Sequence, residues 1–540
     1  MALGTRLRSA PARPRRKPNL VIFLPDQQRA DTVAPYGSGR VHAPNLNRLA
    51  SESVVFDRTY VTHPICTPSR SSLMTGLWPY QTGCTHNNAM LAHRWQCLPE
   101  MLGDADYRTG YMGKWHLGDE VFAQHGFQEW VSMEDIYRFP VSPGRDPAVT
   151  SDYCRFLRGR GYTPDEKRGY FSREYASRLP LELSKPVFLE QHACRFLENH
   201  RDDPFVLVVS FLEPHEPYNG PLNNEHRLED IELEASVTQT FGADIPLRYR
   251  LRQEFQEEMY GTTPADFRLT KRNYWGLVTE VDRSIGAILG KLDTLGLADD
   301  TIVVHTSDHG DMAGRHGLFG KGIYYEESIR VPLLLRLPGQ RRARVIDRPV
   351  SLLDLFPTTC GLAGLPVPKG LDGIDLSRAL RPAQPKAWPR KTVSSMYLIY
   401  AARVTYTGAI PDGAPNSAFR TLRWKDWKYV AIQGGRPLLF DLRRDPGERQ
   451  NLAELPKHAR LIAKLDRLTF GRNSWATYQR QLRRDRRRGP KFLSGKKPTT
   501  PNQYRLPDGR TFDAEGALYE QRWLQIPPHM TGGIIPQSYG

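Results

Sequence analysis

Three short apolar runs constrain the fold of this chain more than any other feature of its sequence. They are Asn19–Leu24 (NLVIFL), Phe205–Phe211 (FVLVVSF) and Thr301–Thr306 (TIVVHT). Such runs are typical of strands that are buried on both faces of a parallel sheet. Polar side chains follow each run closely: Asp26, His215 and Asp308. Because sites in open α/β sheets form at the carboxyl ends of the strands, we expect these side chains to meet at one edge.

The segment between the second and third runs has the periodicity of an amphipathic helix. Its apolar residues recur every three or four positions: Tyr274, Leu277, Val281, Ile285, Ile288 and Leu292. Strands that alternate with helices predict an α/β fold. A chain of 540 residues with 39% hydrophobic and 25% charged residues is long enough for one large domain and a smaller one.

The sequence changes character after about residue 382. Thr421–Ile432 and Pro437–Leu442 are predicted strands joined by a Gly-Gly turn, and Leu452–Leu468 is a predicted helix. We therefore expect a small α+β domain behind the large one. The expected division is a basic N-terminal extension (1–17), the large domain (18–390), the small domain (391–480) and a basic C-terminal tail (481–540).

The formal net charge of +16 favours anionic substrates or polyanions. A dense run of arginines at 483–488 is not accompanied by a recognition motif, so we expect no nucleic-acid partner.

The tail becomes apolar again at Trp523–Tyr539, which suggests docking on the chain's own body or on another subunit, and hence a homo-oligomer. No apolar run is long enough to span a bilayer, and Met1–Pro18 does not have the pattern of a secretory signal, so a cytoplasmic location without membrane contact is expected.

The six cysteines form no C-x-x-C pair, which makes a disulfide framework or a zinc ribbon an unfavoured interpretation. Cys66 stands apart because it begins the segment CTPSRSSLMTG, residues 66–76. This segment resembles the C-x-P-S-R…T-G signature of type I sulfatases, members of the alkaline phosphatase superfamily that carry formylglycine. The motif is expected to open a helix at Ser69–Leu73, just past Pro68, and a helix N-terminus favours an anion.

The resemblance extends from about Lys17 to Glu454 and is closest to the arylsulfatases. The matching blocks are NLVIFLPDQQRAD (19–31), GYMGKWHLG (110–118), PHEP (214–217), SDHG with GLFGKG and YEESIRVP (307–332), and RRDPGERQNLA (443–453). It implies a large mixed or mostly parallel sheet sandwiched by helices, with a smaller C-terminal domain. It also implies that a formylglycine-generating maturation enzyme oxidises Cys66 to the aldehyde.

The resemblance implies hydrolysis of a sulfate ester through a covalent sulfo-formylglycine intermediate. One hydroxyl of the hydrated aldehyde attacks sulfur, and the other then expels sulfate, which divides one difficult step into two easier ones. The implied metal ligands are Asp26, Gln27, Asp308, His309 and the formylglycine at Cys66. Carboxylate and amide oxygens suit calcium, the usual ion of the family, whereas the imidazole also admits magnesium or manganese.

The resemblance also implies the remaining catalytic roles. Arg70 and Lys114 would hold the formylglycine hydroxyls, and Lys321 would hold the sulfate. His116 would be the base that starts sulfate release and His215 the acid that protonates the leaving alcohol, since imidazole titrates near neutrality. Further candidates for the substrate pocket are Gln81, Asn87, Asn88 and His316.

Two alternatives remain open at this point. Phosphonate monoester hydrolases and phosphodiesterases of the same superfamily share formylglycine and the Asp-Gln and Asp-His pairs, although this chain has Ser69 where they usually carry Gly or Ala. A non-catalytic binder of sulfated polyanions is the second alternative, which the complete catalytic set disfavours. The substrate is expected to be a small-molecule or carbohydrate sulfate ester, selected by loops in 120–180 and 225–267.

Overall fold

A computed structural model describes most of the chain. The described residues are 17–37, 39–92, 94–102, 107–136, 148–261, 263–380, 388–398, 418–471, 473–478, 480, 503–505 and 511–513. Within them, no helix is both long enough and apolar enough to cross a membrane. The arginine run and the apolar end of the predicted tail lie outside the described residues.

The three apolar runs are neighbouring strands at the centre of one sheet, as predicted. They are β1 (Asn19–Phe23), β5 (Phe205–Ser210) and β6 (Thr301–Thr306), and β1 pairs in parallel with the other two. The sheet has eight strands in the order β4-β3-β5-β1-β6-β7-β2-β8. Its outer strands are β2 (Val54–Tyr60), β3 (Arg108–Gly113), β4 (Glu129–Val131), β7 (Leu333–Arg336) and β8 (Arg344–Ser351). Only β7 runs antiparallel to both neighbours within this sheet, so the sheet is mixed but mostly parallel.

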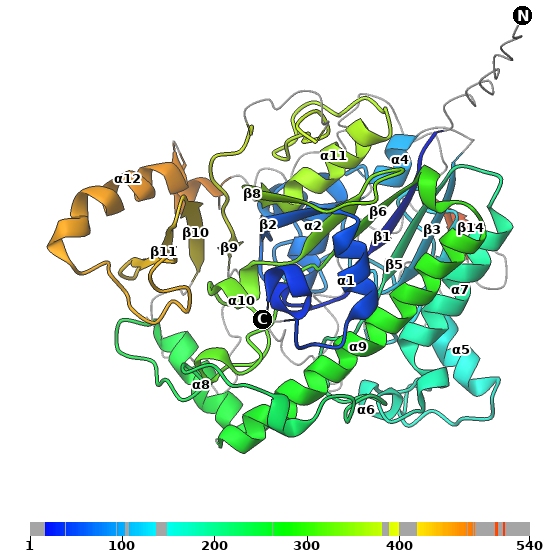
Figure 1. The fold of residues 1–540 in the computed structure, drawn as a ribbon, viewed down its shortest axis with the longest axis horizontal. Helices are drawn as coiled ribbons and strands as arrows, with labels where there is room; N and C mark the ends of the chain where they lie inside the picture. The colour runs from blue at the N-terminus through cyan, green and yellow to red at the C-terminus, as the bar shows by residue number, and fades with distance from the viewer. Residues whose placement is uncertain are drawn as a thin grey trace, which may run out of the picture.

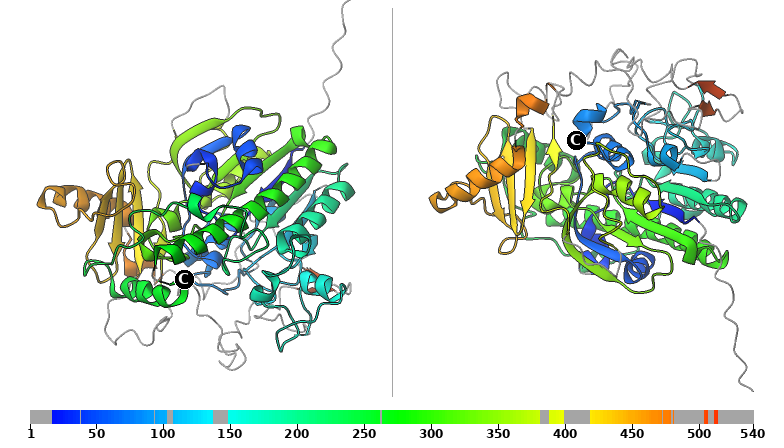
Figure 2. Two further views of the ribbon diagram at one scale, coloured as in Figure 1. Left: turned by 60° about the horizontal axis from the view of Figure 1, so that its bottom comes forward. Right: turned by 90° about the horizontal axis from the view of Figure 1, so that it is seen from above.

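Helices cover both faces of this sheet (Figures 1 and 2). One face carries α1 (Pro44–Ser51), α7 (Lys185–Asn199) and α9 (Pro264–Thr294), and the other carries α2 (Cys66–Thr75), α4 (Leu98–Leu102) and α11 (Leu355–Leu362). Alternate residues of β1 pack into the two hydrophobic cores on either face of the sheet. Val21 and Phe23 belong to the core under α9, whereas Leu20 and Ile22 belong to the core under α2. Further helices among the described residues are α3 (Pro79–Thr82), α5 (Asp152–Arg158), α6 (Arg173–Ala176), α8 (Leu247–Tyr260), α10 (Glu326–Ile329) and α12 (Ala459–Phe470).

A second sheet of four antiparallel strands follows, in the order β12-β11-β10-β9. Its strands are β9 (Met396–Tyr397), β10 (Phe419–Trp424), β11 (Trp427–Ile432) and β12 (Leu438–Asp441). Separately, β13 (Gln503–Arg505) pairs antiparallel with β14 (Thr511–Asp513). The prediction of one strand at 421–432 was wrong, because the chain turns at Lys425, whose φ is 54°. The helix α12 begins at Ala459 rather than Leu452, because Pro456 disfavours helical backbone before it.

The two sheets share a core cluster, which contains Tyr324 and Tyr325 from the large domain and Phe419, Val430 and Phe440 from the second sheet. A buried ion-pair cluster lies at this junction. Lys428 Nζ lies 2.6 Å from Glu448 Oε1 and 3.2 Å from Glu326 Oε1. The Glu326 backbone N–H, at the start of α10, donates to Glu448 Oε2 at 2.6 Å. Glu448, from the RRDPGERQNLA block, thus connects the two sheets.

We expect Lys428→Met to destabilise the chain by about 3–5 kcal/mol, because its removal leaves the buried Glu448 without its cation and Glu326 with the more distant Arg423. Urea unfolding followed by circular dichroism measures this difference. Arg436→Met is the matched control, since Arg436 pairs with Glu454 at the surface, where such pairs contribute about 1 kcal/mol or less. Equal stabilities of the two variants would contradict the structural role of the cluster.

His305, in β6, is a second buried polar residue with a measurable consequence. Burial lowers its pKa to about 3, and neither ring nitrogen has a hydrogen-bond partner among the described residues. The unfolded chain therefore takes up a proton near pH 6.5 that the folded chain takes up only near pH 3, so stability is lost as the pH falls between these values. We expect His305→Leu to reduce this dependence by about 1.4 kcal/mol per pH unit between about pH 5.5 and 4. Urea unfolding across this range tests it, and an unchanged slope would contradict the prediction.

Candidate active site

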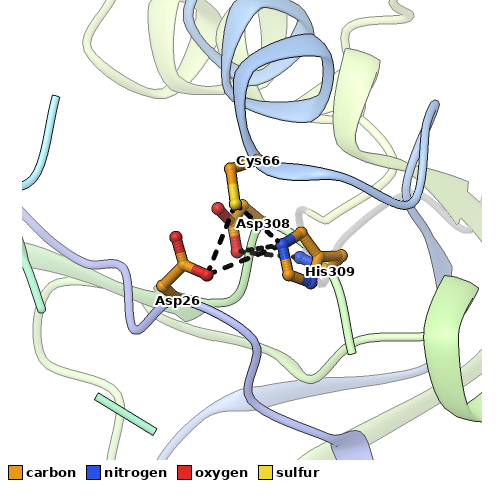
Figure 3. Close-up of side chains that lie close together, drawn as sticks. All are labelled: Asp26, Cys66, Asp308 and His309. Atoms are coloured by element: carbon orange, nitrogen blue, oxygen red, sulfur yellow. Dashed lines mark hydrogen bonds and ion pairs between the residues drawn. The ribbon is translucent and has the colours of Figure 1, made fainter. Parts of the chain in front are cut away.

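Four of the predicted site residues come together where β1 and β6 end (Figure 3). Asp26 follows β1, Asp308 and His309 follow β6, and Cys66 is the first residue of α2. Cys66 Sγ lies 3.2 Å from His309 Nε2 and 3.7 Å from Asp26 Oδ1. The helix begins at Cys66, three residues earlier than predicted, and Pro68 is tolerated in its first turn because no helical hydrogen bond needs its N–H there. This start brings the side chain of residue 66 directly to the strand ends.

These four residues fit a divalent metal ion. Their ligand atoms all lie within 4.8 Å of one another and the side chains are fully buried. Although burial opposes it, Asp308 and Cys66 raise the pKa of His309 to about 9. The site thus favours a positive charge at this imidazole, and a bound metal ion would supply that charge in place of the proton.

Arg70 and Lys114 lie beside the same cluster. Arg70 binds Asp26 Oδ2 at 2.9 Å through Nη2 and Asp308 Oδ2 at 2.7 Å through Nε. Lys114 Nζ lies 2.7 Å from Asp26 Oδ2 and 3.6 Å from Cys66 Sγ. Burial alone would raise the pKa of Asp26, but Lys114 and the other surrounding cations hold it well below its usual value. Arg70 and Lys114 therefore share the carboxylate of Asp26, and Lys114 also reaches Sγ of residue 66; that they hold the formylglycine hydroxyls stays a prediction.

Electrostatics at residue 66 favour an anion. Burial and Asp26 raise the pKa of the Cys66 thiol, yet Lys114 and Lys321 oppose them and the net shift is downward. Sγ lies where a hydroxyl of hydrated formylglycine would lie. The same cations would therefore favour an ionised oxygen at this position.

Gln27 and Lys321 make a contact that the sequence does not predict. Lys321 Nζ donates to Gln27 Oε1 at 2.5 Å and lies 2.5 Å from His215 Nε2. The amide group of Gln27 donates to Glu216 and Tyr218 at 2.8 and 3.0 Å. The structure thus directs the side-chain oxygen of Gln27 to Lys321, and the backbone φ of 69° turns the residue into this position. The metal-ligand role of Gln27 stays a prediction.

His116 lies two residues after Lys114 and has a φ of 56°, and its carbonyl oxygen accepts a hydrogen bond from Thr67 Oγ1 at 2.7 Å. Its Nε2 lies 2.8 Å from Asn88 Oδ1. Glu120 shapes the turn by accepting hydrogen bonds from the backbone N–H groups of Trp115 and His116 at 3.0 and 2.5 Å. Burial, together with Lys114 and Arg70, lowers the pKa of His116 well below its usual value. The imidazole is therefore neutral and can accept a proton.

Of the four further pocket candidates, the two asparagines lie beside the site, whereas Gln81 and His316 have structural contacts. Asn88 contacts His116, and Asn87 accepts the Thr67 N–H at 3.1 Å beside the start of α2. Gln81 instead caps α3 through the Trp78 N–H, and His316 stacks on Tyr325 with 4.0 Å between ring centroids, in the core shared with the second sheet. Sequence reasoning missed Glu120, Glu216, Tyr218 and Asp311, which orient the predicted residues; only Glu216, inside PHEP, carried a signal.

Comparison with known proteins decides the family. The sulfatase family profile matches residues 18–365, well over half of the chain. The chain belongs to the sulfatase family. A second profile, that of the C-terminal region of N-sulphoglucosamine sulphohydrolase, matches residues 314–471 of this sulfatase and includes the second sheet. The protein is accordingly a sulfuric ester hydrolase of the alkaline phosphatase superfamily.

Characterised relatives cover most of this sulfatase. An ulvan-active sulfatase of Formosa agariphila is 29% identical and aligns with 83% of this chain and 80% of its own length. A choline-sulfatase of Rhizobium meliloti is 30% identical over 82% of this chain and 83% of its own. The crystal structure of a phosphonate monoester hydrolase of Agrobacterium radiobacter has the same fold, with a TM-score of 0.66, 24% identity, and coverage of 86% of this chain and 96% of that one.

Proposed function

We propose that this sulfatase hydrolyses a small-molecule or carbohydrate sulfate ester with formylglycine at position 66 as its nucleophile. One observation carries the proposal: residue 66 begins a buried helix and lies within hydrogen-bonding reach of Asp26, Lys114 and His309. A maturation enzyme that reads C-x-P-x-R would supply the aldehyde. The motif is complete as Cys66, Pro68 and Arg70.

A divalent cation, with calcium first and magnesium or manganese next, would be held by Asp26, Asp308, His309 and residue 66, with Gln27 as a further ligand. When bound, it would act as a Lewis acid that withdraws negative charge from the sulfate oxygens. Arg70 and Lys114 neutralise Asp26 and orient residue 66 toward the sulfur. Charge that grows on the sulfate would also meet Lys321, and stabilisation of that charge by these cations would lower the barrier.

The leaving alcohol needs a proton. Burial and Lys321 lower the pKa of His215 well below its usual value, so the imidazole is neutral near neutral pH and keeps one N–H, at Nδ1, which lies 2.8 Å from the carbonyl oxygen of Glu216. The proton to be delivered is instead one of the ammonium protons of Lys321, whose Nζ lies 2.5 Å from His215 Nε2. We propose that this pair delivers it to the ester oxygen as the S–O bond breaks. The sulfate group is then bonded to one oxygen of residue 66.

Release of sulfate regenerates the aldehyde. His116, which is neutral, takes the proton from the second hydroxyl of residue 66, the C=O bond forms, and sulfate leaves with the electron pair of the C–O bond. Water then adds to the aldehyde. The two hydroxyls of residue 66 have by then given up one proton each, the first on attack and the second to His116; one of these restores the Lys321–His215 pair and the other leaves with sulfate, so the sum is ester plus water to alcohol plus hydrogen sulfate. Asn88 and Glu120 hold His116 in place for this step.

The two alternatives are separated by one comparison. The protein, coexpressed with a formylglycine-generating enzyme and checked by mass spectrometry at the Cys66 peptide, is assayed with a chromogenic aryl sulfate and the matching aryl phosphonate ester. We expect the larger kcat/KM with the sulfate. A larger value with the phosphonate would assign the chain to the phosphonate hydrolase branch, and binding of sulfated polyanions without turnover of either ester would favour the binder.

Metal removal gives a further prediction. Dialysis against EDTA is expected to abolish turnover, because four buried ligands would be left without the charge that they are arranged around. Calcium, magnesium or manganese should restore it, and isothermal titration of the stripped protein should show one catalytic site. Full activity after complete stripping would contradict the metal assignment.

The arrangement of the chain completes the proposal. Residues 18–390 would form the catalytic domain, and residues 391–480 would form a smaller domain. The smaller domain contacts the catalytic domain through Glu448, which accepts the backbone N–H of Glu326. Exchange of the tail at 481–540 between subunits stays a hypothesis. Light scattering of a chain truncated after residue 488 tests it, and an unchanged oligomeric state would contradict it.

A further inference from the structure

A second group of metal-ligating side chains lies outside the catalytic cluster. Cys97, Glu100 and His125 are buried, and their ligand atoms lie within 4.8 Å of one another. His125 Nδ1 is 3.5 Å from Glu100 Oε2. We propose that these residues form a binding site for a transition-metal ion of the zinc type, separate from the catalytic centre. The proposal does not depend on the catalytic mechanism.

The imidazole of His125 is oriented as a metal ligand requires. Its Nε2 lies 3.2 Å from the carbonyl oxygen of Leu91, so this nitrogen carries the proton. Nδ1 is then the nitrogen with the lone pair, and it faces the carboxylate. Protein histidines that bind metals use the same arrangement, in which a backbone carbonyl fixes the tautomer from behind. Two facing acceptors need a cation or a proton between them.

Glu100 lacks the compensation that a buried carboxylate normally has. Its side chain is 1% exposed, and Oε2 accepts the Cys97 backbone N–H at 2.7 Å. Oε1 has no hydrogen-bond partner within the described residues, and no arginine or lysine there forms an ion pair with Glu100. A buried charge without a counter-ion is costly, and a metal ion would remove this cost.

The turn that places His125 against Glu100 has an uncommon backbone conformation. His125 has a φ of 52° and Gly126 one of 81°. A Cβ at Gly126 would lie 2.8 Å from Glu100 Cγ, so the turn is packed directly against this side chain. Strained residues of this kind collect at functional sites. The turn also ends the segment that carries Lys114 and His116, so a metal ion here would fix one wall of the catalytic site.

The ligand types select the ion. Thiolate, imidazole and carboxylate together suit zinc, whereas calcium and magnesium prefer oxygen alone. Zinc at about 2.0–2.3 Å from each ligand needs ligand atoms roughly 3.5 Å apart, which requires only a small contraction of this cluster. Burial and Glu100 raise the pKa of the Cys97 thiol well above its usual value, so metal binding would release the thiol proton.

The experiment removes the competing thiol first. Full-length Cys66→Ala protein is stripped of metal and titrated with Co²⁺, which gives a sulfur-to-cobalt charge-transfer band only when a thiolate binds. We expect this band to saturate at the intensity of one thiolate-bound Co²⁺ per chain, whether or not further Co²⁺ fills the catalytic cluster. We also expect its loss in Cys66→Ala/Cys97→Ser and its retention in Cys66→Ala/Cys154→Ser. Absence of the band in the folded Cys66→Ala protein, or its persistence without Cys97, would overturn the proposal.

A conservative variant guards against loss of folding. Glu100→Gln keeps an oxygen for the Cys97 N–H and removes only the charge. In the Cys66→Ala background it should weaken Co²⁺ binding at this band at least about tenfold while circular dichroism stays unchanged. Unaltered affinity in this variant would exclude Glu100 as a ligand and overturn the three-ligand site.

Discussion

Replacement of Cys66 by alanine is expected to lower kcat/KM for a sulfate ester by at least about 10⁴-fold, the scale on which loss of a nucleophile acts in enzymes that use one. Alanine has no atom that can attack sulfur, whereas Arg70, Lys114 and the metal ligands remain. Stopped assays of the fully matured wild-type and variant proteins measure the difference.

A matched control separates chemistry from folding. Cys154 is equally buried but lies in α5, in the core under α9. Cys154→Ala should keep kcat/KM within about threefold and lose some stability through the small cavity. Cys66→Ala protein that is folded, by circular dichroism, and still turns over at more than a hundredth of the wild-type rate would rule out residue 66 as the nucleophile.

Asp26→Asn is expected to have the second largest effect, because this one carboxylate contacts Lys114, Arg70 and residue 66. Loss of its charge breaks the buried ion pairs with Lys114 and Arg70, of which Arg70 keeps Asp308, and breaking a buried pair typically costs about 3–5 kcal/mol of stability. It also removes a proposed metal ligand, so we expect at least a 10³-fold loss of kcat/KM, comparable with the loss of one strong electrostatic contact in a transition state.

Two measurements separate the loss of metal binding from the loss of stability in Asp26→Asn. Isothermal titration should show weaker binding of the divalent ion, and urea unfolding should show the lower stability. Asp299→Asn, at an exposed aspartate just before β6 that pairs with Arg341, should change neither. Wild-type metal affinity in Asp26→Asn would contradict the metal assignment even if activity fell.

Much of the catalytic cluster could be predicted from the sequence because it depends on local patterns. Continuous apolar runs identify central parallel strands, and their carboxyl ends converge for geometric reasons. Asp26 and Asp308 each follow the carboxyl end of such a strand. They lie close together because β1 and β6 are neighbours in the sheet. The position of Cys66 came from the sulfatase resemblance, because a cysteine at a helix start carries no such signal by itself.

The parts that were missed depend on backbone turns with positive φ and on contacts distant in sequence. Gln27 turns its amide to Lys321, almost three hundred residues away, and His116 turns onto Asn88. Neither glutamine nor histidine requires a positive φ, so no sequence pattern predicts these contacts. The split between β10 and β11 was missed for the same reason, since Lys425 is not a typical turn residue. Cys97 and His125 meet only because the fold brings two loops together.

The central claim is that formylglycine at position 66 carries the turnover, and one titration tests it most directly. Protein batches with graded formylglycine content, made by varying coexpression of the maturation enzyme, are quantified by mass spectrometry of the Cys66 peptide and assayed with a chromogenic aryl sulfate at saturating substrate and metal. The account predicts that turnover per chain rises in proportion to formylglycine content along a line through the origin. Substantial turnover in batches that contain only unmodified Cys66 would contradict it.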